Sequence, residues 1–351
     1  MPEVRFEAAS AYDFFISLIV LHNPADFGLR PSWAAGVRSR LPAAQREFFE
    51  HHLPFLGVPL TWLHDLTIPQ KTTLAVLSAL EQIPPAERLP RLTLIPELRP
   101  EVQIALQEIA ATGRATPAIR TLLKAELEAK RHPPPAGTLD YWISAWSNPA
   151  AFGEEWLFAL RTYFNLFFSE EEARLQSLLE DGVQTASRLL NEQPLPQVVE
   201  TLTRGVSIAE IQQVSQLTLI PSYWSTPFIF FQRLAGQRAL LVFGCRPAHL
   251  SLAGGGAVPL TLVDTFKALG DPTRLRILRF LAQQPLTPAA LAERLRLRAP
   301  TVIHHLNALR RAGLVHIRLD ADGERRYDLR REGLNETLTA LHRFLDSTEE
   351  P

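Results

Sequence analysis

Residues Ala299 to Gly313, with the sequence APTVIHHLNALRRAG, decide the fold of the C-terminal part of this chain. Proline is favoured at the first position of a helix and glycine just beyond its end, and Pro300 and Gly313 stand at those two places. Three apolar residues follow one another at spacings of four and three: Val302, Leu306 and Leu309. This spacing predicts a short amphipathic helix with one apolar stripe that faces a core.

The opposite face of this predicted helix is polar apart from one residue. At 100° per residue, five side chains point away from the apolar stripe: Ile303, His304, Asn307, Arg310 and Arg311. Amide, imidazole and guanidinium groups on one exposed helix face can form hydrogen bonds with base edges and phosphates. The sequence therefore predicts a recognition helix for DNA.

The flanking segments complete a recognisable order of elements. Helices are predicted over 273–281, after the capping pair Asp271–Pro272, and over 288–295, after the capping residue Thr287. Beyond the recognition helix, the alternating run 315–319, a turn and the returning run 324–329 predict a β-hairpin. Three helices followed by such a hairpin form a winged helix-turn-helix.

These segments closely resemble the ArsR/SmtB family of winged-helix repressors. The resemblance covers roughly residues 260–346 and rests on FKALGDPTRLRIL at 266–278 and on a second block between 301 and 315 that ends in AGLV. Ala299 stands where the family usually has a capping residue such as Ser, and Ile303 stands where it usually has a Ser that faces DNA. The expected operator sequence therefore does not follow from the resemblance.

The resemblance and the polar face together indicate double-stranded DNA as the partner. The candidate DNA-binding residues lie on the recognition helix and on the second strand of the wing: Thr301, His304, His305, Asn307, Arg310, Arg311, Arg325 and Arg326. The helix near 262–269 and a closing helix resemble the family's dimer-forming pair, with Leu334, Leu338, Leu341 and Leu345 on one side of the closing helix. The resemblance implies a homodimeric transcriptional regulator, and repression is the expected sign.

Charge is unevenly distributed along the chain. Residues 272–331 contain 13 Arg and five Asp or Glu, a formal charge of +8, while the whole chain carries −1 and the remainder therefore −9. A basic segment over a winged helix is typical of a DNA-binding domain joined to an acidic partner domain. The alternative, a solvated charged surface without function, does not explain why the charge and the motif coincide.

Composition places the protein among globular, cytoplasmic proteins. Hydrophobic residues make up 46% of the chain, and the longest apolar runs, such as Phe14 to Leu21, are too short to span a bilayer. The first residues, MPEVRFE, lack the basic and then apolar pattern of a secretory signal. The single cysteine, Cys245, cannot form an internal disulfide, which favours a reducing compartment and no membrane partner.

An internal repeat is predicted in the N-terminal part. The hexapeptide NPADFG at 23–28 returns as NPAAFG at 148–153, and LTLIP at 92–96 returns at 217–221. Both pairs are separated by 125 residues, which favours a duplication. The alternative is that two generic turn sequences happen to be equally spaced.

The expected fold class is mainly α with small β elements: a duplicated helical N-terminal domain followed by a C-terminal winged helix-turn-helix. Residues 1–130 are expected to be mostly helical, and Ala11 to Leu21 is either a buried helix or a strand. The predicted units are a first helical copy at 1–132, a second copy at 138–250 that ends in a β-hairpin, a flexible linker at 251–259 and the winged helix at 260–346.

No metal and no cofactor are expected. His304 and His305 are adjacent on a helix and diverge by about 100°, so they rarely chelate one ion together. The family's thiolate sites need cysteines near 289–294, where this chain has none. Its other site needs paired His and carboxylates on the last helix, where only His342 and Asp346 are suitably spaced.

The role of the first 250 residues remains open between three hypotheses. An effector pocket for a small apolar molecule could lie between the two copies or in the aromatic-rich second unit, and occupancy would then change operator affinity. The unit could instead be purely architectural and strengthen the dimer. An unrecognised enzymatic activity is the third alternative, although the sequence contains none of the common catalytic motifs and we expect no enzyme.

Overall fold

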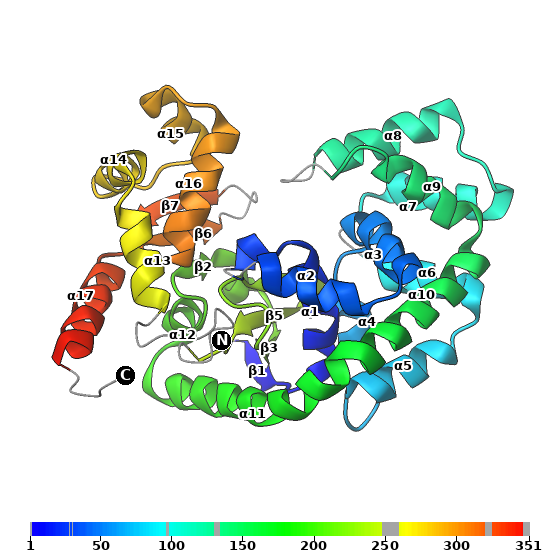
Figure 1. The fold of residues 1–351 in the computed structure, drawn as a ribbon, viewed down its shortest axis with the longest axis horizontal. Helices are drawn as coiled ribbons and strands as arrows, with labels where there is room; N and C mark the ends of the chain where they lie inside the picture. The colour runs from blue at the N-terminus through cyan, green and yellow to red at the C-terminus, as the bar shows by residue number, and fades with distance from the viewer. Residues whose placement is uncertain are drawn as a thin grey trace.

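The computed structural model describes residues 2–27, 29, 31–95, 98–129, 134–247, 260–319 and 325–346. The N-terminal part is an array of helices that curves around a small sheet, and the winged helix lies at the other side of that sheet (Figure 1). Its α-helices are α1 (Ser10–His22), α2 (Pro31–Arg40), α3 (Ala43–Leu56), α4 (Leu60–Asp65), α5 (Thr73–Glu81), α6 (Pro85–Thr93), α7 (Pro100–Thr112), α8 (Pro117–Glu128), α9 (Thr138–Ser147), α10 (Pro149–Tyr163), α11 (Ser169–Glu192) and α12 (Leu195–Leu202). Shorter helical turns are η1 (Pro24–Phe27), η2 (Phe164–Phe168) and η3 (Ala209–Gln213).

A four-stranded sheet lies inside this array. Its strands are β1 (Glu3–Phe6), β3 (Gln216–Ser222), β4 (Phe230–Leu234) and β5 (Arg238–Gly244), in the order β1-β3-β5-β4. The antiparallel pairing of β4 with β5 confirms the predicted hairpin, whereas β3 pairs in parallel with both β1 and β5. Strand β1 was not expected, because the sequence predicted helix for most of the first 130 residues.

The ambiguous segment Ala11 to Leu21 is a helix, and α1 is buried on nearly every side. Its one carboxylate, Asp13, is fully buried and accepts hydrogen bonds from the Ser222 hydroxyl and from the backbone N–H groups of Tyr223 and Trp224. Burial raises the pKa of Asp13 to about 6, and the three hydrogen bonds oppose that rise. Asp13 thereby ties α1 to the turn that leaves β3.

The C-terminal part confirms the predicted winged helix-turn-helix. It consists of α13 (Leu260–Leu269), α14 (Pro272–Leu281), α15 (Pro288–Leu295), α16 (Ala299–Arg311), the antiparallel wing strands β6 (Val315–Leu319) and β7 (Arg325–Leu329), and α17 (Arg331–Asp346). The predicted linker at 251–259 and the wing turn at 320–323 lie outside the described residues.

A third strand extends the wing from the N-terminal part of the chain. Strand β2 (Val206–Ile208) pairs in parallel with β6, and the Ile317 N–H donates to the Gly205 carbonyl at 2.8 Å. Side chains of α12 and of the β3–β5 pair share one apolar core with α14, α15 and α16. The winged helix is therefore packed against the N-terminal part and not merely tethered to it.

The two pentads of the proposed repeat adopt different structures. Residues 217–221 form the middle of strand β3, whereas 92–93 end helix α6 and 94–95 are extended. The two hexapeptides also differ, since the first leads into η1 and the second opens α10 with Asn148 as its N-cap. The duplication remains a prediction.

Among the described residues, no helix combines the length and the apolar character that a bilayer-spanning segment needs.

Helices α6 and α10 pack closely through a glycine, and this contact yields a stability prediction. A Cβ on Gly153 would lie 2.1 Å from the Pro85 carbonyl oxygen, whereas a Cβ on Gly36 in α2 would meet no atom within 4 Å. Gly153→Ala should lower the stability by about 1–3 kcal/mol through overpacking, and Gly36→Ala should raise it by up to about 1 kcal/mol through helix propensity. Melting temperatures followed by circular dichroism check both changes; equal values for the two variants would contradict the described packing.

Candidate nucleic-acid interface

The predicted apolar stripe fixes the orientation of α16. Val302, Leu306 and Leu309 are fully buried against the core of the domain. Gly313 has a φ of +68°, the left-handed conformation that the sequence predicted just beyond the helix. The N-cap of α16 is Arg298, whose side chain makes no capping hydrogen bond, and Ala299, where a capping residue such as Ser is usual in the family, is the first residue of the helix.

Helix α14 is held at its start by Asp271. Its carboxylate accepts hydrogen bonds from the backbone N–H groups of Thr273 at 2.8 Å and Arg274 at 3.0 Å. The hydrogen bond from Arg274 is the main reason that the pKa of Asp271 lies below its usual value. This cap sets the start of α14, which packs directly against α16.

The open part of α16 is its N-terminal half. Thr301 and His304 are exposed, as are Arg296 and Arg298 in the turn that precedes the helix. Arg296 has a φ of +57°, and this left-handed residue turns the chain from α15 into α16. The two arginines were counted in the basic segment but not among the candidate DNA-binding residues; their position within four residues before Pro300 could have identified them.

The C-terminal half of α16 is partly covered. The Arg310 guanidinium lies over the ring of Phe228, 5.0 Å from its centroid, and Phe228 belongs to the N-terminal part of the chain. Arg311 is half-buried and acts electrostatically on Asp264 of α13. The structure therefore places these two predicted contacts away from the open half of the helix.

The two remaining candidates on α16 are half-buried. His305 lies near Asp271 and Arg274, and desolvation lowers its pKa, which favours the neutral ring. The rings of His304 and His305 lie edge to face, with centroids 6.0 Å apart. Asn307 is also half-buried.

The wing carries the last two candidates, Arg325 and Arg326, and both are exposed at the start of β7. On the neighbouring strand, His316 lies with Nδ1 2.9 Å from a Glu200 carboxylate oxygen and Nε2 3.6 Å from one of Glu332. Glu200 belongs to α12, so this histidine adds a polar contact beside the β2–β6 pairing. The wing is thus fixed on the side that faces the N-terminal part.

Helices α13 and α17 pack against each other and leave large apolar side chains uncovered. Phe266 is 42% exposed, Leu338 53% and Leu345 67%. Helix α17 lies at the outer edge of the molecule, and α13 lies between it and α16 (Figure 1). In the parts of the chain that the structure describes, no group of three or more His, Cys, Asp or Glu side chains could hold a metal ion.

A comparison with known families matches this C-terminal part. The family described as "Bacterial regulatory protein, arsR family" matches residues 271–316. The chain is 45% identical over 56 residues to an uncharacterized HTH-type transcriptional regulator, MJ1325, of Methanocaldococcus jannaschii. The aligned residues make up 16% of this chain and 63% of that protein. It is 38% identical over 52 residues to the transcriptional repressor SdpR of Bacillus subtilis, 15% of this chain and 58% of that protein.

Among solved structures, an ArsR-like transcriptional regulator from Rhodococcus sp. RHA1 is 36% identical, with 24% of this chain and 78% of that chain covered and a TM-score of 0.22. This chain spans about three fifths of the length of the curated relatives that it matches.

The Asp271 cap predicts a pH-dependent contribution to stability. Asp271→Ala should cost about 1 kcal/mol near neutral pH, because two N–H groups lose their acceptor. Since the folded state lowers the pKa of this carboxyl, the contribution is present above the unfolded pKa and is lost as the pH falls through the folded value. Urea unfolding at about pH 7 and about pH 3 measures the free energy of unfolding of the unmodified protein and of Asp271→Ala. The difference between the two proteins should be smaller at the lower pH.

Asp271→Asn is the matched control, because asparagine caps nearly as well as aspartate. An Asp271→Ala penalty that is equal at both pH values would show that the carboxylate charge contributes nothing.

Proposed function

Residues 271–316 form an ArsR-family helix-turn-helix domain, and on this basis we propose that the protein is a DNA-binding transcriptional regulator that represses its target genes. The observation that carries the proposal is the open start of α16: Thr301 and His304 on the helix are exposed, and so are Arg296 and Arg298 in the turn before it. In a helix-turn-helix, the N-terminal residues of the recognition helix contact base edges in the major groove. Arg325 and Arg326 would contact phosphates from the wing.

The proposed active form is a homodimer. The exposed apolar residues Phe266, Leu338 and Leu345 on α13 and α17 would be covered by the same surface of a second copy. A dimer of this kind reads two half-sites separated by about 10 base pairs, because one face of the duplex repeats at that interval.

Binding to promoter DNA is the first test of this function. His304→Ala and Arg298→Ala should each weaken binding to a fragment of the protein's own promoter region by about 1–3 kcal/mol if the side chains read bases. His51→Ala is the matched control, since His51 stacks on Tyr141 far along the chain from α16. Fluorescence anisotropy at several salt concentrations measures the affinities, and binding that is absent or insensitive to salt would rule out the proposal.

We further propose that the controlling signal is not a metal ion. The support is the lack of a cluster of three ligand side chains among the described residues and the burial of Cys245, which raises the pKa of its thiol. Titration of zinc, cadmium or arsenite into the protein–DNA complex at micromolar concentrations should leave the affinity unchanged. A stoichiometric loss of binding that a chelator reverses would contradict this part of the proposal.

A further inference from the structure

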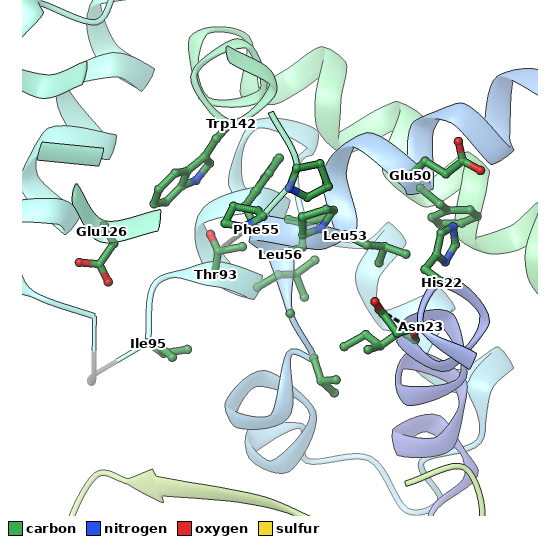
Figure 2. Close-up of a pocket in the computed structure, with 18 of the residues that line it drawn as sticks. His22, Asn23, Glu50, Leu53, Phe55, Leu56, Thr93, Ile95, Glu126 and Trp142 are labelled. Atoms are coloured by element: carbon green, nitrogen blue, oxygen red, sulfur yellow. Dashed lines mark hydrogen bonds between the residues drawn. The ribbon is translucent and has the colours of Figure 1, made fainter. Parts of the chain in front are cut away.

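A cavity with a volume of about 930 Å³ lies in the N-terminal helical array. This is within the usual range for small-molecule sites. Its wall is mainly apolar, with buried side chains from α3, α7 and α9 that include Phe49, Leu53, Phe55, Leu106 and Trp142. Figure 2 shows Trp142 and Glu126 on one side of the cavity and His22 and Asn23 on the other.

His22 offers a hydrogen-bond acceptor at the cavity wall. His22 Nδ1 lies 2.8 Å from the Leu18 carbonyl oxygen and therefore carries the proton, and its Nε2 is buried without a partner. Desolvation lowers the pKa of His22, so the ring is neutral and Nε2 is an acceptor. Thr93 donates its hydroxyl proton to the Leu89 carbonyl at 2.7 Å, and Asn23 donates an N–H to the Ile19 carbonyl at 3.1 Å.

The formal charge of the wall is negative. Three carboxylates line the cavity, Asp26, Glu50 and Glu126, against one guanidinium, Arg38. Arg38 donates to the Leu21 carbonyl at 2.6 Å, and Glu126 accepts from Arg99 at 2.7 Å. Arg38 and Glu50 both act electrostatically on His22, with opposite effects on its pKa, and the effect of Arg38 is the larger. Because carboxylates outnumber guanidinium groups in the wall, a ligand with an apolar body and a positively charged donor suits it.

We propose that this cavity is the effector site and that it takes a hydrophobic organic cation, an aromatic or aliphatic body that carries a protonated amine. The body would pack against Phe55 and Trp142, and the ammonium would donate to Nε2 of His22 beside Glu50. This inference rests on the proposed function, because it supplies the non-metal signal for a DNA-binding regulator.

A line of contacts joins the cavity to the recognition helix. Phe27 of η1 lines the cavity, and its ring meets the ring of Phe228 edge to face with centroids 5.1 Å apart. The Arg310 guanidinium of α16 also lies over the Phe228 ring, 5.0 Å from its centroid. Arg246 links the two segments that carry Phe27 and Phe228, because its guanidinium donates hydrogen bonds to the backbone carbonyls of Phe27 and Thr226.

A ligand that displaces Phe27 therefore changes the support of Phe228, and with it the position of Arg310 and α16. The effect on DNA affinity equals the difference in the ligand's affinity for the two arrangements.

Binding to the protein alone is the first experiment. Pyrenemethylamine, pyrenemethanol and pyrenecarboxylate share one apolar body and differ only in the charge and the donor capacity of the head group. Titration calorimetry should rank the amine first, with the carboxylate weaker by at least about tenfold, which corresponds to 1.4 kcal/mol. Equal affinities, or tighter binding of the carboxylate, would overturn the proposed ligand class.

Two variants locate the site. Glu50→Gln and His22→Leu should each weaken binding of pyrenemethylamine several-fold. Glu50→Gln should weaken binding of pyrenemethanol less than it weakens binding of the amine. Glu47→Gln, one turn earlier on α3 and outside the cavity wall, is the matched control and should bind as the unmodified protein does. If His22→Leu melts early, Glu50→Gln still decides, because Glu50 is exposed. Unchanged binding by Glu50→Gln would place the site elsewhere.

Coupling is measured with promoter DNA. Pyrenemethylamine should change the DNA affinity of the unmodified protein several-fold, and Phe228→Ala should retain amine binding while this change falls toward none. A full response in Phe228→Ala would overturn the proposed route. The proposed function and the proposed effector site can fail separately. Salt-sensitive DNA binding without amine binding would contradict only the effector site. Amine binding without DNA binding would contradict the proposed function.

Discussion

The parallel pairing of β2 with β6 is the contact on which the arrangement of this protein depends. A wing strand at the edge of its sheet would otherwise leave a row of unpaired backbone groups, and here β2 of the N-terminal part covers them. The apolar core that α12, β3 and β5 share with the winged helix supports the same contact. The orientation of α16 is therefore set by the N-terminal part as well as by its own domain.

This arrangement places the two halves of α16 in different surroundings. Its first half, with Thr301 and His304, is exposed and suits contact with bases. Its second half carries Arg310, whose guanidinium lies over Phe228. Under the proposed function, the contact between Phe228 and Arg310 connects the helical array with α16 directly.

The sequence predicted the winged helix because its signals are local. The buried stripe of Val302, Leu306 and Leu309 and the left-handed Gly313 are properties of one segment and its immediate neighbours. Strands β1 and β2 were missed, because each is short and is defined by a partner more than 100 residues away. The burial of Arg310 was missed for the same reason, since the helical pattern of α16 contains no information about Phe228.

The most direct test of the account is hydrogen–deuterium exchange of the full-length protein with and without its promoter DNA. The account predicts that DNA slows exchange over residues 296–304 and the start of β7, while the Ile317 amide, which donates to Gly205, is protected in both states. Rapid exchange at Ile317 in the free protein, or DNA protection that avoids the start of α16, would contradict it.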